Sequence, residues 1–152
     1  MFFRILQIAV PFIWFGMIGA ISFLEAPLKF QAPGITLALG LGIGRLVFQT
    51  LNIIEIAFAV MLVVSFLVSR PSGLFVKAAA AVIVTLLALE TVWLLPALDV
   101  RAEAVIQGTA APFSQMHLLY IAFDAIKFLL LFALGVTIAK QNLRFDNRTE
   151  RY

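Results

Sequence analysis

One apolar stretch of this 152-residue chain carries polar side chains at helical spacing. His117, Tyr120, Asp124 and Lys127 follow one another at intervals of 3, 4 and 3 residues. At ~100° per residue, these intervals place all four side chains within an arc of about 80° on one helix face. An imidazole, a phenol, a carboxylate and an ammonium group can hold or exchange protons, and a carboxylate also binds cations. The stripe therefore predicts a polar site on an otherwise apolar helix.

A second polar stripe lies in an earlier apolar stretch. Arg45, Gln49, Asn52 and Glu55 are 4, 3 and 3 residues apart and share one helix face. A third apolar stretch adds Glu90, which no nearby basic residue of its own helix neutralises. A charged group inside a membrane span costs at least about 2.5 kcal/mol, so such groups normally face a bundle interior, a cavity or a partner. The two stripes therefore predict an interior polar seam that binds a ligand or ion. We expect it to consist of Arg45, Asn52, Glu55, Glu90, His117, Tyr120, Asp124 and Lys127.

Each of these groups also has a structural interpretation. Asp124 with Lys127, or Glu55 with Arg45, would form a neutralising pair that holds the register of neighbouring helices. His117 would then be a hydrogen-bonded structural residue rather than a metal ligand or a proton carrier. Glu90 resists this interpretation, since it needs a partner, a proton or a cation. The sequence leaves these alternatives open, and it identifies no metal or cofactor.

The composition indicates what surrounds these polar groups. Hydrophobic residues make up 63% of the chain and charged residues 12%, and the mean hydropathy is +1.08. The apolar residues fall in runs of about 20, which at ~1.5 Å per residue match the ~30 Å hydrocarbon core of a bilayer. The absence of cysteine excludes disulfides, thiolate metal sites and catalytic thiols. Basic residues flank the apolar runs, where they serve membrane topology, so nucleic-acid binding is excluded.

The predicted fold is all-α, a single integral membrane domain (residues 1–152) that forms an antiparallel bundle of four transmembrane helices. The spans are predicted at about 5–24, 45–69, 74–98 and 113–139, and a short polar cytoplasmic tail follows at 140–152. Pro27 predicts the end of the first helix. Residues 26–44 predict a connector whose glycine-dense second half is either a re-entrant piece or an extension of the next helix. Residues 99–112 predict a linker.

The lysines and arginines near the helix ends predict the orientation. Seven basic residues lie on the side of the N-terminus and three on the other side. The first group is Arg4, Arg70, Lys77, Lys140, Arg144, Arg148 and Arg151, and the second is Lys29, Arg45 and Arg101. We therefore expect both termini in the cytoplasm, in a multi-pass protein of the cell inner membrane. Counting from the outer ends places Asn52, Glu55 and Asp124 near the bilayer middle, so the polar cluster should open toward the non-cytoplasmic side.

Short motifs along the chain resemble a bacterial family of small four-helix membrane proteins of unknown function. That family is related to a eukaryotic transmembrane protein associated with drug resistance. The motifs are Ala26-Pro27 with Phe30, Gly44 with Phe48, Asn52 with Glu55, and Ser114 with His117 and Tyr120. Asp124 departs from the pattern, which has a glutamate there, whereas Lys127 follows it. The resemblance implies the membrane fold and no particular activity.

We expect the seam to bind a proton, a small cation or a small solute, in a role related to transport. Glu55, Glu90 and Asp124 would be its carboxylate sites, and Arg45, His117 and Lys127 would tune their charge. The alternative is an accessory or assembly subunit of a larger membrane complex. A membrane enzyme using His117 with Asp124 ranks last, because no nucleophile or metal-binding set accompanies them. Four helices leave little room for a wide pore, so transport predicts a homo-oligomer or other membrane subunits as partners.

Overall fold

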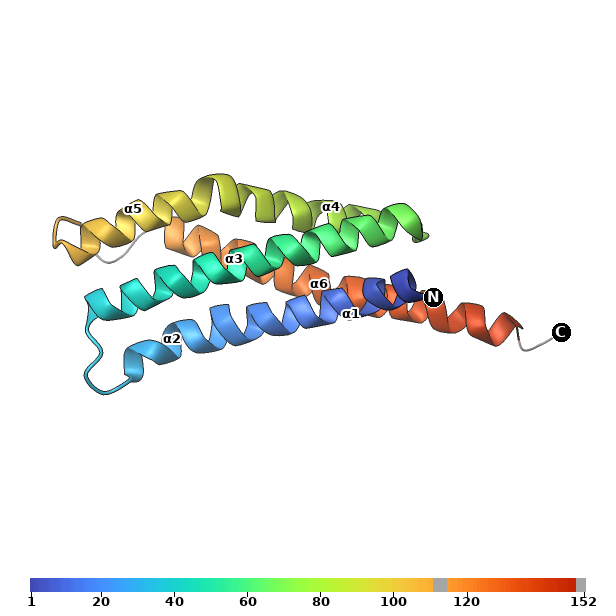
Figure 1. Ribbon diagram of the computed structural model, residues 1–152, viewed down its shortest axis with the longest axis horizontal. Coiled ribbons are helices and arrows are strands. Elements are labelled where there is room, and N and C mark those ends of the chain that lie inside the picture. The colour runs from blue at the N-terminus through green and yellow to red at the C-terminus, as the bar shows by residue number, and fades with distance from the viewer. Residues whose placement is uncertain (111–114, 150–152) are drawn as a thin grey trace.

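The computed structural model describes residues 1–110 and 115–149, with side chains as far as residue 142. The described residues form helices and no strand. This confirms the predicted all-α fold, and four long helices are long and apolar enough to cross a membrane, as a multi-pass membrane protein requires. They cover Phe2–Gln31, Leu37–Val68, Leu74–Ile106 and Gln115–Asn142, and we number them first to fourth. Figure 1 shows them lying alongside one another, with the start of the first helix and the C-terminal part of the fourth toward the same end.

The first long helix continues through Pro27, so the prediction that it ends there is wrong. It consists of α1 (Phe2–Ile18), the π-helical η1 (Gly19–Glu25), α2 (Ala26–Leu28) and the 3₁₀-helical η2 (Lys29–Gln31). Pro27 lies in the first turn of α2, directly after the π-helical segment. In a regular α-helix a proline lacks an amide donor and clashes with the carbonyl of the preceding turn, whereas here the preceding turn is π-helical. The change of helix type therefore lets the chain keep its direction.

The third long helix passes a second proline in the same way. It consists of α4 (Leu74–Leu89), the π-helical η3 (Glu90–Leu94) and α5 (Leu95–Ile106). Pro96 lies in the first turn of α5. Because α5 continues to Ile106, the predicted end of the helix near residue 98 is wrong. The predicted linker is helical as far as Ile106. Gly108 follows with φ +73°, a left-handed conformation that glycine adopts without strain.

The second and fourth long helices also extend beyond their predicted bounds. The second is α3 (Leu37–Val68), and the Thr36 side chain caps its start by accepting a hydrogen bond from the amide of Leu39 at 3.2 Å. The glycine-dense part of the predicted connector is therefore an extension of this helix. The fourth, α6 (Gln115–Thr149), continues into the predicted polar tail. Its predicted start at residues 113–114, which includes Ser114 of the family motif, lies outside the described residues.

The apolar core fills the half of the bundle that carries the termini. α1 packs against α3 and α6, α4 packs against α6, and α3 packs against α5. Fully buried core side chains come from all four long helices. They include Trp14, Ile18, Leu62, Ile83, Leu131, Leu134 and Ile138. Many apolar side chains on the outer faces are exposed, as is usual for helices whose solvent is lipid.

A buried amide ties the first helix to the end of the second. The Gln7 side chain donates hydrogen bonds to the carbonyl oxygens of Ser65 at 2.8 Å and Ser69 at 2.5 Å. The Ser65 carbonyl also accepts the backbone amide of Ser69 at 2.9 Å, and Ser69 is the residue that directly follows α3. Gln7 adds a donor to both carbonyls and so fixes where α1 lies against this end of α3.

Candidate functional site

A lysine and three carboxylates meet in the interior of the bundle. The ammonium Nζ of Lys127 lies 2.8 Å from Glu55 Oε1 and 2.9 Å from Asp124 Oδ1, and it also pairs with Glu90 Oε2. Glu55 comes from α3, Glu90 begins η3, and Asp124 and Lys127 are one turn apart on α6. We call these four residues the carboxylate cluster. Three long helices are thereby joined through one ammonium group.

The carboxylate cluster is removed from solvent. The four side chains are 0–2% exposed. The transfer of an ion from water to such an interior costs several kcal/mol, which attraction between opposite charges offsets only when the geometry is good and the remaining lone pairs are satisfied. Here the lone pairs are not all satisfied. Among the described residues, Glu90 Oε1 and both oxygens of Asp124 have no hydrogen-bond partner.

The charges within the carboxylate cluster do not balance. Three ionised carboxylates carry three negative charges, and the ammonium of Lys127 supplies one positive charge, which leaves an excess of two negative charges. Unpaired charge in a low-dielectric interior is strongly unfavourable, and buried groups commonly neutralise by taking up protons. The cluster therefore needs one or two protons, or a bound cation, in addition to Lys127.

The three carboxylates also meet the spacing of a metal site. One oxygen each from Glu55, Glu90 and Asp124 lies within 4.8 Å of the others. Oxygen ligands of this kind suit hard cations such as Mg²⁺ or Ca²⁺. However, the Lys127 ammonium pairs with all three carboxylates and takes the place that a metal ion would need. This arrangement favours protons over a metal ion as the exchangeable species.

Trp14 belongs to the site, although the sequence analysis did not select it. Its indole Nε1 donates a hydrogen bond to Glu55 Oε1 at 2.7 Å, and its side chain is fully buried. Through Trp14, the first long helix also contacts the carboxylate cluster. A signal was present in the sequence, since a tryptophan in mid-span rather than at an interface needs a hydrogen-bond acceptor in the protein.

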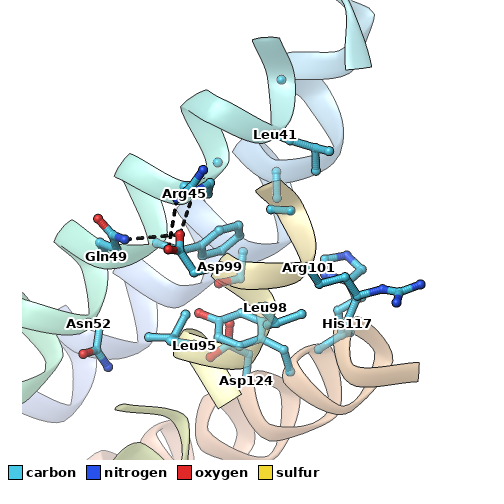
Figure 2. A pocket seen from close by; sticks show the side chains of 18 of the residues that line it. Leu41, Arg45, Gln49, Asn52, Leu95, Leu98, Asp99, Arg101, His117 and Asp124 are labelled. Carbon is cyan, nitrogen blue, oxygen red and sulfur yellow. Dashed lines mark hydrogen bonds and ion pairs between the residues drawn. The ribbon is translucent and has the colours of Figure 1, made fainter. Parts of the chain in front are cut away.

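A cavity of about 1040 Å³ leads from one end of the bundle to Asp124. It lies in the half of the bundle away from the termini and between all four long helices. Asn52, Thr91 and Tyr120 line it together with Asp124. Asn52 is held by a hydrogen bond from its Nδ2 to Thr91 Oγ1 at 2.9 Å. Figure 2 shows Asn52 and Asp124 on opposite sides of this inner part.

Arg45 lies at the outer end of the cavity, and the predicted pair of Arg45 with Glu55 is wrong. Its Nε is 2.5 Å from Asp99 Oδ1 and its Nη1 is 2.6 Å from Glu103 Oε2, as Figure 2 shows for Asp99. Arg45 and Glu55 are ten residues apart, about 15 Å along the helix axis. The helical continuation into α5 brings Asp99 and Glu103 beside Arg45 instead. These side chains are 31–46% exposed, so the pairing adds little stability.

The remaining predicted residues line the cavity without joining the carboxylate cluster. Tyr120 is buried one turn before Asp124, and its ring packs edge-on against Phe48 with centroids 5.2 Å apart. His117 is exposed at the outer part of the cavity, as Figure 2 shows. The other predicted pair, Asp124 with Lys127, is present. The structure thus brings four of the eight predicted residues together and arranges the other four along the approach to them.

Comparisons of the chain with protein-family models, with curated proteins and with solved structures found no match.

The replacement Lys127→Met tests whether the ammonium holds the helices together. We expect it to lower the free energy of unfolding by about 3–5 kcal/mol, because it leaves buried carboxylates without their ion-pair partner. Lys77→Met is the matched control. It makes the same change at an exposed lysine and should alter stability by no more than about 0.5 kcal/mol. Thermal unfolding in detergent measures both variants.

A second comparison separates lost charge from lost packing. Adding Glu55→Gln and Glu90→Gln to Lys127→Met removes two of the uncompensated charges and should recover much of the lost stability. Equal melting of the Lys127→Met and Lys77→Met variants would contradict the assignment.

Proposed function

We propose that the chain crosses the cell inner membrane four times as an antiparallel bundle with both termini in the cytoplasm. The four apolar helices support the number of crossings. The excess of lysine and arginine on the side of the termini supports the orientation. In this arrangement the cavity opens toward the non-cytoplasmic side. The resemblance to the bacterial four-helix membrane family agrees with four crossings.

Single cysteines test this topology directly, since the chain has none of its own. Ser72→Cys places a thiol in the connection between α3 and α4, and Gln107→Cys places one after α5; both positions are exposed. A maleimide that cannot cross membranes should label only Gln107→Cys in intact cells, and both variants after the membrane is opened. Labelling of Ser72→Cys in intact cells would reverse the proposed orientation.

We further propose that the carboxylate cluster is an exchangeable proton-binding site of a transport protein. The observation that carries this proposal is the excess of two negative charges among buried side chains that a cavity reaches from one side. A purely structural ion pair needs one carboxylate for one ammonium, whereas Lys127 faces three. The additional carboxylates can take up and release protons, and each such step changes the net charge between the helices.

Access to the carboxylate cluster differs between its two sides. On the cavity side, Asp124 lines a space of about 1040 Å³. On the side of the termini, closely packed apolar residues such as Val10, Ile83 and Leu134 close the bundle. Such an arrangement suits a site that opens to one side of the membrane at a time. Proton uptake would weaken the ion pairs between the helices. It would thereby favour a conformation in which the carboxylate cluster is open to the side of the termini and closed to the cavity side.

Charge movement on a solid-supported membrane tests proton binding without the need to know a transported solute. A pH step applied to adsorbed proteoliposomes should produce a transient current, because protons enter a buried site within the membrane. The double variant Glu55→Gln with Glu90→Gln should lose most of this current. It should still fold, since Lys127 and Asp124 remain as a neutral pair.

The control for this experiment is Glu103→Gln, which removes a carboxylate from the exposed outer end of the bundle. This variant should keep the current of the unmodified protein. A Na⁺ step at constant pH should give no current, because Lys127 occupies the centre of the carboxylate cluster. The proposal fails if the double variant responds like the unmodified protein, or if Na⁺ and not the pH step produces the current.

A further inference from the structure

Asp124 has a property that the charge balance of the cluster does not explain. Its side chain is fully buried and lines the cavity, yet neither of its oxygens has a hydrogen-bond partner among the described residues. Lys127 Nζ forms an ion pair with Oδ1 at 2.9 Å, while its hydrogen bonds go to Glu55 and Glu90. The Tyr120 hydroxyl interacts with the same carboxylate from one turn earlier on α6. A buried carboxylate without donors is costly. Asp124 is therefore arranged to receive a donor from the cavity.

Ser22 is a second unpartnered polar group on the same cavity. Its hydroxyl oxygen is buried and has no hydrogen-bond partner among the described residues. It lies at the level of Asp124, because the neighbouring Phe23 packs against Phe128, one turn beyond Asp124, with ring centroids 5.3 Å apart. Asn52 lines the same region. The inner end of the cavity therefore offers several hydrogen-bonding groups around one carboxylate.

The walls between this inner end and the outer end are apolar and aromatic. Phe48, Leu95 and Ile121 line this part, and the ring of Tyr120 packs against Phe48. Aromatic faces attract cations as well as apolar groups. The volume of about 1040 Å³ matches the upper end of cavities that hold small organic ligands. A bare proton or metal ion needs no such space.

Two of the basic groups at the outer end, Arg45 and Lys29, are already paired; Arg101 also lines this end of the cavity. Arg45 pairs with Asp99 and Glu103, and Lys29 pairs with Glu25 at 3.2 Å. Their charges are thus already matched by carboxylates, whereas the carboxylate cluster at the inner end carries a negative excess. Electrostatic complementarity favours a ligand with its positive end inward.

We propose that the cavity binds a primary ammonium compound with an apolar, preferably aromatic, body, and that its ammonium group donates hydrogen bonds to Asp124. This inference rests on the proposed function, for which it names the class of transported solute. The ligand's ammonium group supplies hydrogen-bond donors to Asp124 and offsets part of the negative excess of the carboxylate cluster. The apolar body occupies the space between Phe48, Leu95 and Ile121.

Three matched probes test this assignment in nanodiscs, with empty nanodiscs subtracted. They are 2-phenylethylammonium, 2-phenylethanol, which lacks the charge, and N,N,N-trimethyl-2-phenylethylammonium, which keeps the charge but has no N–H donor. The primary ammonium should bind at least about tenfold more tightly than either analogue, as expected for a charge-assisted hydrogen bond. Equal binding of all three probes would overturn the assignment without the use of any variant.

Variants then locate the binding site. Asp124→Asn should weaken binding of the primary ammonium by about tenfold or more, because it removes the charge and one acceptor oxygen. Asp99→Asn makes the same replacement at the outer end of the same cavity and should weaken binding by less than about threefold, since that carboxylate is partly exposed. Equal effects of the two variants would contradict the placement at Asp124.

The outcomes separate this inference from the proposed function. A pH-dependent current that requires Glu55 and Glu90, together with no preference for the primary ammonium, overturns the ligand assignment and leaves the proton site standing. Selective ammonium binding that requires Asp124, together with no proton-dependent current, overturns the proton site and establishes a binding protein.

Discussion

The structure depends on one ammonium group that faces three carboxylates in an apolar interior. Lys127 reaches Glu55, Glu90 and Asp124 from the fourth long helix, and Trp14 of the first long helix donates to the same Glu55 oxygen. In a bilayer the burial of apolar surface provides no net attraction between helices, so polar contacts and close packing must hold them together. The carboxylate cluster meets this need and also creates an imbalance of charge. In the proposed function, stability and proton binding therefore have the same origin.

The two π-helical segments allow the first and third long helices to form walls of the cavity. η1 carries Ser22 and η3 begins at Glu90, and each is followed by a proline in the first turn of the next α-helix. A π-helical turn changes the direction in which later side chains face, and such turns are frequent at functional sites. Here they keep the first and third long helices continuous beyond the carboxylate cluster. The helices can then form the walls of a cavity where a loop would otherwise lie.

The sequence predicted the carboxylate cluster better than it predicted the ends of the helices. The 3- and 4-residue spacing in α6 and the isolated charge of Glu90 identified the cluster, because periodicity and charge balance are local properties. The predicted helix ends near Pro27 and residue 98 are wrong, because neither a proline nor a run of charged residues reveals the π-helical segments after which these helices continue. The Arg45–Glu55 pair was wrong for the same reason, since Asp99 and Glu103 were assigned to a linker. Trp14 was missed because its role depends on tertiary packing.

The central claim is that the carboxylate cluster holds protons within the membrane at neutral pH, and infrared spectroscopy of the protein in nanodiscs tests it most directly. Protonated carboxylic acids absorb at a C=O stretching frequency distinct from that of carboxylates. The account predicts a carboxylic-acid band from the unmodified protein at neutral pH that weakens in Glu55→Gln or Glu90→Gln and is unchanged in Glu103→Gln. The absence of such a band from the unmodified protein would show that all three carboxylates are ionised and would contradict the account.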